Sequence, residues 1–238
     1  NMPPIQEKET MKKLAFLAVL LVPTMAFGAI SGSKHDLSSG NTSNSVYNTS
    51  TDQLCVFCHV PHNANSQSLI WSRTLSTAAL SWGATTTSNG TSLNTSPSLI
   101  TQQCLSCHDG SVALGDVVSG PYTIVASSKV TGGALDSDSN AFLSRSSFVN
   151  HPVGVPYTDT YNGYNGINSG VTAGTDDYRA DAGGTVTNGG DSVDLNLSSG
   201  DYGVECSTCH DVHNSADISM FLQVDNSGSA LCLVCHTK

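Results

Sequence analysis

The sequence predicts a mostly irregular fold with short helices and little β-structure, and three observations carry that prediction. Only 12% of the 238 residues are charged and 6% are aromatic, and Ser, Thr, Asn and Gly recur in clusters typical of loops. Long apolar segments that could build a protein-only core are few. All eight cysteines fall in four copies of C-x-x-C-H, and one helical turn would bring the two thiols of each copy to the same side. We therefore expect a short helix at each motif.

C-x-x-C-H is the attachment signature of c-type haem, in which two thioethers hold the porphyrin and the histidine becomes the proximal iron ligand. Zinc sites or disulfides could use the cysteines, but both would leave the histidine after every pair unexplained. We therefore predict four covalently attached c-type haems, which would form a stacked core. The attachment residues are Cys55, Cys58, Cys104, Cys107, Cys206, Cys209, Cys232 and Cys235, and the proximal ligands are His59, His108, His210 and His236.

Four histidines remain for the four distal positions, namely His35, His62, His151 and His213. This match in number predicts bis-His iron throughout, with no coordination position left open for a substrate. The sequence thus favours electron transfer over catalysis, and we do not expect an enzyme. An all-histidine ligand set also implies low potentials, because methionine raises them. Met220 could replace a distal histidine, but we expect it to pack against a haem edge.

Two of the motifs are extended to C-x-x-C-H-x-x-H, which places His62 three residues after His59 and His213 three residues after His210. Residues i and i+3 lie on nearly the same side of a helical turn. The two axial ligands of one iron lie on opposite faces of the porphyrin. We therefore expect each extra histidine to ligate a haem other than the one its own motif holds, which would bring haems close enough for electron transfer.

The N-terminal region predicts export. Two lysines follow Met11, residues 14–27 are almost wholly apolar, and Gly28 precedes Ala29, as in a secretory signal peptide. We expect residues 1–10 to be a non-native upstream extension, residues 11–28 the signal peptide, and residues 29–238 one tetrahaem domain. The apolar run is short for a membrane span, so no span is expected in the mature chain.

The longest interval between motifs contains a segment rich in Gly, Asn, Asp, Thr and Tyr, which we interpret as a surface insertion over about residues 157–203. Within it, residues 192–197 alternate like a strand. Residues 185–191 have the pattern of a strand that enters a turn. The net charge of −10 argues against a nucleic-acid partner, which would need a basic surface.

The paired C-x-x-C-H-x-x-H motifs, the Ser-Lys-His-Asp segment around His35 and the His-Pro-Val-Gly-Val segment from His151 resemble multihaem cytochromes with doubled C-x-x-C-H motifs. In size and haem number the chain is similar to the tetrahaem outer-surface cytochromes of metal-reducing bacteria. That resemblance implies a mostly irregular multihaem cytochrome c fold and polymerisation into extracellular filaments, also called cytochrome nanowires. It also implies that one iron takes a histidine from the neighbouring subunit. The Gly/Tyr-rich insertion is not covered by the resemblance.

For the histidine donated to a neighbour we favour His62, with His35 second, because His62 belongs to the first motif and so lies near one end of a linear haem order. The expected function is long-range electron transfer at the cell surface or outside the cell, with redox proteins or extracellular acceptors as partners. The main alternative is a monomeric tetrahaem shuttle in the periplasm. A third possibility is a haem redox enzyme or the electron-input subunit of one.

Overall fold

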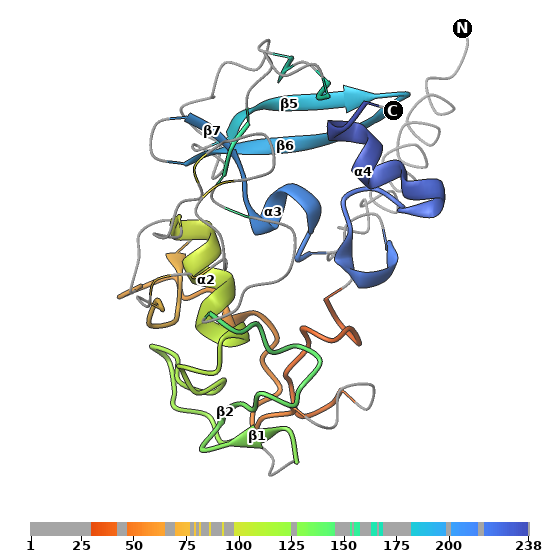
Figure 1. Ribbon diagram of the computed structural model, residues 1–238. Helices are drawn as coiled ribbons and strands as arrows, with labels where there is room; N and C mark the ends of the chain where they lie inside the picture. The colour runs from red at the N-terminus through yellow and green to blue at the C-terminus, as the bar shows by residue number, and fades with distance from the viewer. Residues whose placement is uncertain are drawn as a thin grey trace, which may run out of the picture.

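The computed structural model describes residues 30–41, 47–64, 70–76, 79, 81, 86, 92, 98–124, 128–145, 153, 155–157, 163–165, 167–168, 182–198, 201–213 and 217–237 (Figure 1). The predictions for the leader, for the residues before it and for His151 fall outside these residues. Among the described residues, no helix is both long and apolar enough to cross a bilayer.

In the described part of the chain the helices are short, and four of them coincide with the C-x-x-C-H motifs, as predicted. The helices are η2 (Cys55–Phe57), α2 (Leu99–His108), α3 (Cys206–Cys209), η4 (Ser219–Phe221), η5 (Ser227–Ser229) and α4 (Ala230–Cys235). Helix α2 begins where the Ser98 hydroxyl accepts a hydrogen bond from the Thr101 amide at 3.2 Å. The other three motif helices have 3, 4 and 6 residues, which suffices to place both thiols of a motif on one side.

Two antiparallel sheets complete the described fold. The strands are β1 (Val130–Thr131), β2 (Ala134–Leu135), β3 (Val155–Pro156), β4 (Ile167–Asn168), β5 (Ala182–Asn188), β6 (Asp191–Ser198) and β7 (Asp201–Val204). Strands β1 and β2 form a ribbon, and the others form a sheet in the order β3-β7-β6-β5-β4. The β5–β6 hairpin turns at Gly189 and Gly190, whose φ angles of 62° and 101° suit glycine. Both strand predictions in the insertion are thereby confirmed.

The elements follow one another along the molecule. Figure 1 shows the five-stranded sheet at one end, α3 and α4 against it, α2 in the middle and the β1–β2 ribbon at the other end. Helix α4 packs against β5 and β6, α3 packs against β6, and α2 packs against α3 and β2. The helices of motifs 2, 3 and 4, numbered in chain order, therefore contact one another or a shared sheet.

The chain also has an apolar core of its own, which its composition did not lead us to expect. The core consists of Tyr157, Val186, Val193, Leu195, Val204, Val224 and Val234. Val193 and Leu195 alternate with the less buried Asp194, so one face of β6 points into this core. The segment interpreted as a surface insertion thus packs its hairpin against motif 4. The low helix and strand content agrees with the predicted irregular fold, whereas the haem-stack core stays a prediction.

Candidate haem-binding sites

Motif 1 forms a tight turn that is held by a neighbouring extended segment. The Cys58 and His59 amides donate to the Cys55 carbonyl at 3.2 and 2.9 Å. Beyond the turn, Ser72 donates to the Cys58 carbonyl at 2.9 Å, and Val60 donates to the carbonyl of Ile70 at 2.9 Å. His59 thereby forms a β-bridge with Trp71, whose ring lies 6.3 Å from the imidazole, measured between centroids. The backbone that carries His59, the predicted proximal ligand, is therefore fixed on both sides.

Motifs 3 and 4 repeat this arrangement. The carbonyl of the second cysteine accepts from Gln223 at 2.9 Å in motif 3 and from Asn165 at 2.8 Å in motif 4. His210 forms a β-bridge with Leu222, and His236 forms one with Tyr164. The Tyr164 ring also contacts the His236 imidazole at 5.1 Å. Each of these motifs thus has a helical turn, an extended histidine and a clamping segment that lies elsewhere in the sequence.

Motif 2 is held differently, because its helix is longer and ends at the histidine. Leu143 donates to the His108 carbonyl at 2.7 Å. The next residue, Asp109, accepts from the hydroxyls of Ser76 and Ser111 and forms an ion pair with Arg145. Burial alone would raise the pKa of Asp109, but the hydrogen bonds from Ser111 and Ser76 and the charge of Arg145 outweigh it and lower the pKa below its usual value.

Backbone carbonyls orient three of the eight histidines. The Nδ1 atom of His108 lies 2.7 Å from the Ala141 carbonyl, and that of His210 lies 3.0 Å from the Met220 carbonyl. A carbonyl oxygen only accepts, so each Nδ1 carries the proton and Nε2 is left with its lone pair for a metal. The Val212 carbonyl also accepts a hydrogen bond from the His35 ring. The tautomers of His108 and His210 fit an iron ligand.

Burial and the charge of His108 lower the pKa of His35 to about 4, against a smaller opposing effect of its hydrogen bond to the Val212 carbonyl. Burial also lowers the pKa of His108. Both imidazoles are therefore neutral at pH 7, which is the form that binds a metal.

Two predicted distal histidines lie opposite predicted proximal ones. The ring centroids of His35 and His108 are 6.0 Å apart with an interplanar angle of 76°. Those of His59 and His213 are 6.2 Å apart at 18°. His213 thus faces motif 1 rather than its own motif, in the sense that the i+3 geometry predicts. His62 is exposed, and among the described residues it makes no hydrogen bond or ring contact.

The thiols of successive motifs are neighbours. Cys58 interacts electrostatically with Cys107, Cys104 shares a hydrogen bond with Cys206, and Cys209 interacts with Cys232 and Cys235. The Thr101 hydroxyl lies 3.6 Å from the Cys206 sulfur. The first cysteines of motifs 1 and 4 are exposed, whereas those of motifs 2 and 3 are partly covered. The attachment points therefore form a connected series in motif order.

None of the eight cysteines forms a disulfide. Burial raises the pKa of Cys58 to about 12 and that of Cys235 to about 11. In the part of the chain that the structure describes, no three His, Cys, Asp or Glu side chains converge where they could hold a bare metal ion.

Two residues that tie the motifs together were not predicted from the sequence. Arg73 is fully buried, and its guanidinium donates to the carbonyls of Leu114, Ser106 and Ala113 at 2.6, 2.9 and 2.9 Å. Glu205, also fully buried, is the N-cap of α3 and accepts from the Thr101 hydroxyl on α2. The position of an acidic residue directly before a motif helix was the available signal for Glu205, whereas Arg73 had none.

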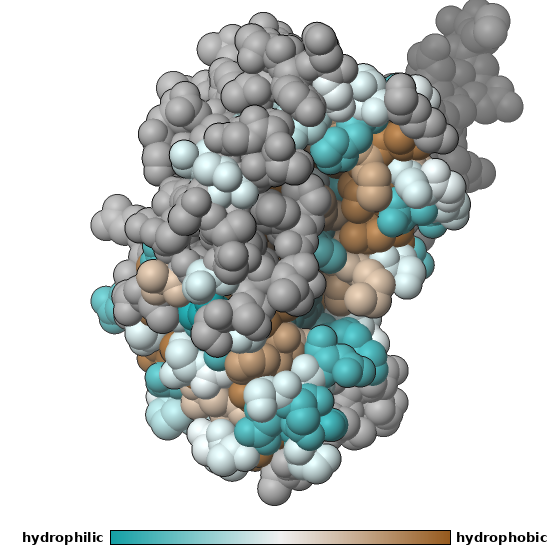
Figure 2. All heavy atoms as spheres, viewed as in Figure 1, coloured by the Kyte–Doolittle hydropathy of each residue, from teal (hydrophilic) through white to brown (hydrophobic). Residues whose placement is uncertain are grey.

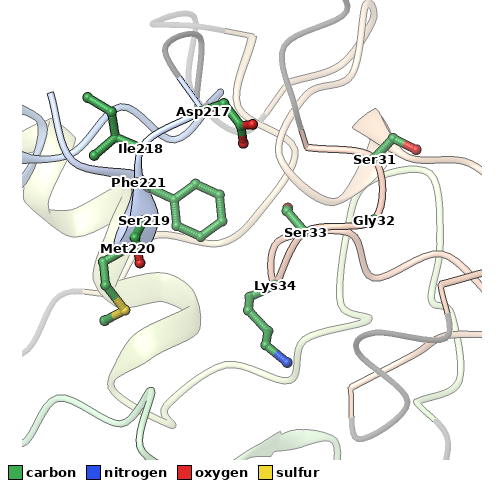
Figure 3. Close-up of a pocket in the computed structure, with 9 residues that line it drawn as sticks. All are labelled: Ser31, Gly32, Ser33, Lys34, Asp217, Ile218, Ser219, Met220 and Phe221. Carbon is green, nitrogen blue, oxygen red and sulfur yellow. The ribbon is translucent and has the colours of Figure 1, made fainter. Parts of the chain in front are cut away.

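A cavity of about 460 Å³ lies beside these sites, between residues 31–34 and 217–221 (Figure 3). The Phe221 ring points across it toward Ser33, and Met220 points away from it and is 74% exposed. Phe221 also packs on the His35 imidazole, with centroids 4.4 Å apart. Residues 217–221 thus contact His35 through the Phe221 ring and His210 through the Met220 carbonyl.

Residues 200–238, which contain motifs 3 and 4, match the family described as "Doubled CXXCH motif". No curated protein matches the chain. The doubled motif supports a multihaem c-type cytochrome, which binds haem covalently through its C-x-x-C-H motifs and takes part in electron transfer. The helical turns, the carbonyl-bound Nδ1 atoms and the paired imidazoles of this chain fit that cofactor.

Proposed function

We propose that this protein carries electrons over long range through four bis-His c-type haems, as the subunit of an exported, extracellular cytochrome filament. Bound haem would supply a one-electron iron couple. The chain would hold the four groups in a fixed series, set their axial ligands and exclude water from their inner edges. The proposal rests on one observation: a cysteine thiol of each motif interacts with a cysteine thiol of the next motif.

The proposed series runs in motif order, from motif 1 to motif 4. The contacts between α2 and α3 and the hydrogen bond between Cys104 and Cys206 support adjacent porphyrin edges in the middle of the series. The exposure of Cys55 and Cys232 supports accessible ends, where electrons would enter and leave. Apolar residues gather over α4 on the face viewed in Figure 2. The α4 residues Leu231 and Leu233 are half-buried. Such a surface suits the face of a porphyrin.

Bis-His ligation at all four irons would leave no position for a small substrate, so we propose an electron carrier rather than an enzyme. The distal ligands would be His35, His62, His151 and His213. The imidazole pairs at 6.0 and 6.2 Å support two of these assignments. The remaining two histidines would serve motifs 3 and 4.

In the proposed filament, His62 ligates a haem iron of the neighbouring subunit. Its exposure supports a role outside its own chain. His35, the second candidate, is half-buried, is hydrogen-bonded to Val212 and lies opposite His108, which favours a role within its own chain. Redox proteins or extracellular acceptors would complete the pathway at the ends of the filament.

The proposal is tested on native material. Pyridine haemochrome analysis and intact mass should return four haems per chain, and electron microscopy should show filaments. The His62→Ala variant should keep four haems, lose the filaments and bind one equivalent of CO per reduced subunit. Filaments of normal length from His62→Ala would remove this residue from the junction. Wild-type protein that sediments only as a periplasmic monomer with four low-spin haems would establish the shuttle instead.

A further inference from the structure

We infer that the iron of motif 1 is ligated by His59 and His213, and the iron of motif 2 by His108 and His35, each pair within a single chain. This inference rests on the proposed haem content and adds the partner of each distal histidine. Counting histidines could not give that pairing, because every distal residue is equivalent in a count.

The spacing of the rings carries the assignment. Two imidazoles on opposite faces of one iron have centroids roughly 6.3 Å apart, because a metal–imidazole nitrogen bond is roughly 2.0 Å and the ring centre lies roughly 1.1 Å beyond the nitrogen. The observed centroid distances are 6.0 Å for His35–His108 and 6.2 Å for His59–His213. In each pair, one member follows a C-x-x-C turn directly and the other comes from a distant part of the chain.

The loop that carries His35 is fixed independently of any cofactor. The buried Asp36 carboxylate accepts from the Gly32 amide at 2.8 Å and from the Ser38 amide at 3.0 Å. The His35 amide donates to the Ser33 hydroxyl at 3.1 Å. Phe221 packs on the imidazole at 4.4 Å and the Val212 carbonyl accepts its hydrogen bond. A ring held by its backbone, one face and one nitrogen is preorganised as a ligand.

The loop that carries His213 is fixed by Asp211. The His213 amide donates to the Asp211 carboxylate at 3.0 Å, and the Asp211 amide donates to the Phe221 carbonyl at 2.7 Å. The chain therefore turns away from His210 immediately after the motif, which explains how His213 reaches motif 1. Asp211 and Phe221 thus support both distal ligands: Asp211 holds the turn that carries His213, and Phe221 packs on His35.

The two pairs differ in ring orientation, which gives them different spectroscopic signatures. Nearly parallel imidazoles, as in His59–His213 at 18°, interact with the same one of the two iron dπ orbitals and separate it in energy from the other dπ orbital. Nearly perpendicular imidazoles, as in His35–His108 at 76°, each interact with a different one of the two dπ orbitals and leave the two close in energy. Low-spin ferric iron then gives a rhombic EPR signal in the first case and a highly anisotropic one in the second.

The pairing narrows the choice of junction ligand. With His35 and His213 used within the chain, His62 and His151 remain for motifs 3 and 4. The exposed His62 is then the histidine available to a second copy of the chain.

The pairing is tested on the haem-loaded protein by removing one distal histidine at a time and counting the irons that lose a ligand. His213→Gly and His35→Gly should each create one high-spin iron that binds one equivalent of CO, and added imidazole should restore the low-spin spectrum. In a Cys55→Ser/Cys58→Ser background, which lacks the motif-1 haem, His213→Gly should create no further vacancy, whereas His35→Gly should still create one. A new vacancy from His213→Gly in that background would overturn the assignment.

EPR of the four-haem single variants covers the case in which the cysteine variants do not mature. His35→Gly should remove one haem equivalent of the highly anisotropic signal, and His213→Gly one equivalent of the rhombic signal. Lys129→Met, which breaks only a solvent-exposed ion pair with Asp138, is the control and should change neither signal. Loss of the same signal type from both variants would refute the pairing. Wild type with fewer than four haems or with high-spin iron would instead refute the proposed function.

Discussion

Replacing Arg73 tests how motifs 1 and 2 are joined. Arg73 directly follows the segment that clamps motif 1, and its guanidinium reaches the end of the motif-2 helix at Ser106 and the turn at Ala113 and Leu114. Arg73→Met would keep most of the side-chain volume and leave two buried carbonyls and one part-buried carbonyl without this donor. We therefore expect a large loss of stability that originates between the two motifs.

The size of the effect follows from the burial of the carbonyls. Each buried acceptor that loses its partner costs about 1–3 kcal/mol. Removing the buried charge returns part of this cost, because its desolvation penalty disappears. A net loss of about 3 kcal/mol would lower the unfolding midpoint by roughly 6–12 °C in a domain of this size. Arg73→Lys, which keeps the charge but not the planar set of donors, should lie between the variant and wild type.

The assay is thermal unfolding of the four-haem protein, followed by circular dichroism and by the Soret band. Lys129→Met is the matched control, because it also removes a cation, but one whose 2.8 Å ion pair with Asp138 is exposed to solvent. The control should leave the midpoint unchanged. A midpoint for Arg73→Met within about 2 °C of wild type, roughly 1 kcal/mol or less, would refute the role assigned to Arg73.

Three further predictions concern the haem sites. All four irons should be low-spin in the resting protein, and a high-spin optical or EPR signal in wild type would contradict this. Phe221→Ala should leave four haems but speed CO binding at one iron, because the His35 ring loses its packing partner at 4.4 Å; an unchanged CO rate would contradict this. Glu205→Ala should cost about 1–2 kcal/mol in thermal unfolding, because α3 loses its N-cap and the Thr101 hydroxyl loses its acceptor.

The elements that the sequence predicted are those whose signals are local. A C-x-x-C-H motif needs a helical turn wherever it occurs, and all four motifs have one. The β5–β6 hairpin follows from alternation over a few residues and a Gly-Gly turn at 189–190. The same hairpin places Val186 and Leu195 in a protein core, which composition hid because the apolar residues there are isolated between polar ones.

The features that the sequence did not predict are long-range. Three motifs are each held by a single β-bridge, formed by Trp71, Leu222 or Tyr164. A single bridge leaves no periodic pattern in the sequence, so it could not be predicted. A buried arginine contradicts the usual exposure of cations, so Arg73 had no reason to be singled out. The i+3 rule excluded His213 from its own motif, but only the folded chain brings its ring to His59.

The proposed junction follows from how unevenly the ligands are distributed. Motifs 1, 2 and 3 depend on one another, because His213 of the extended motif 3 faces His59 and because Cys104 contacts Cys206. Motif 4 lies on the sheet with Cys232 exposed, and the exposed His62 belongs to motif 1. A contact in which His62 of one copy completes motif 4 of the next joins two different surfaces. Such heterologous contacts continue indefinitely unless their rotation closes a ring, so this pairing would generate a filament with motif 4 of one copy beside motif 1 of the next.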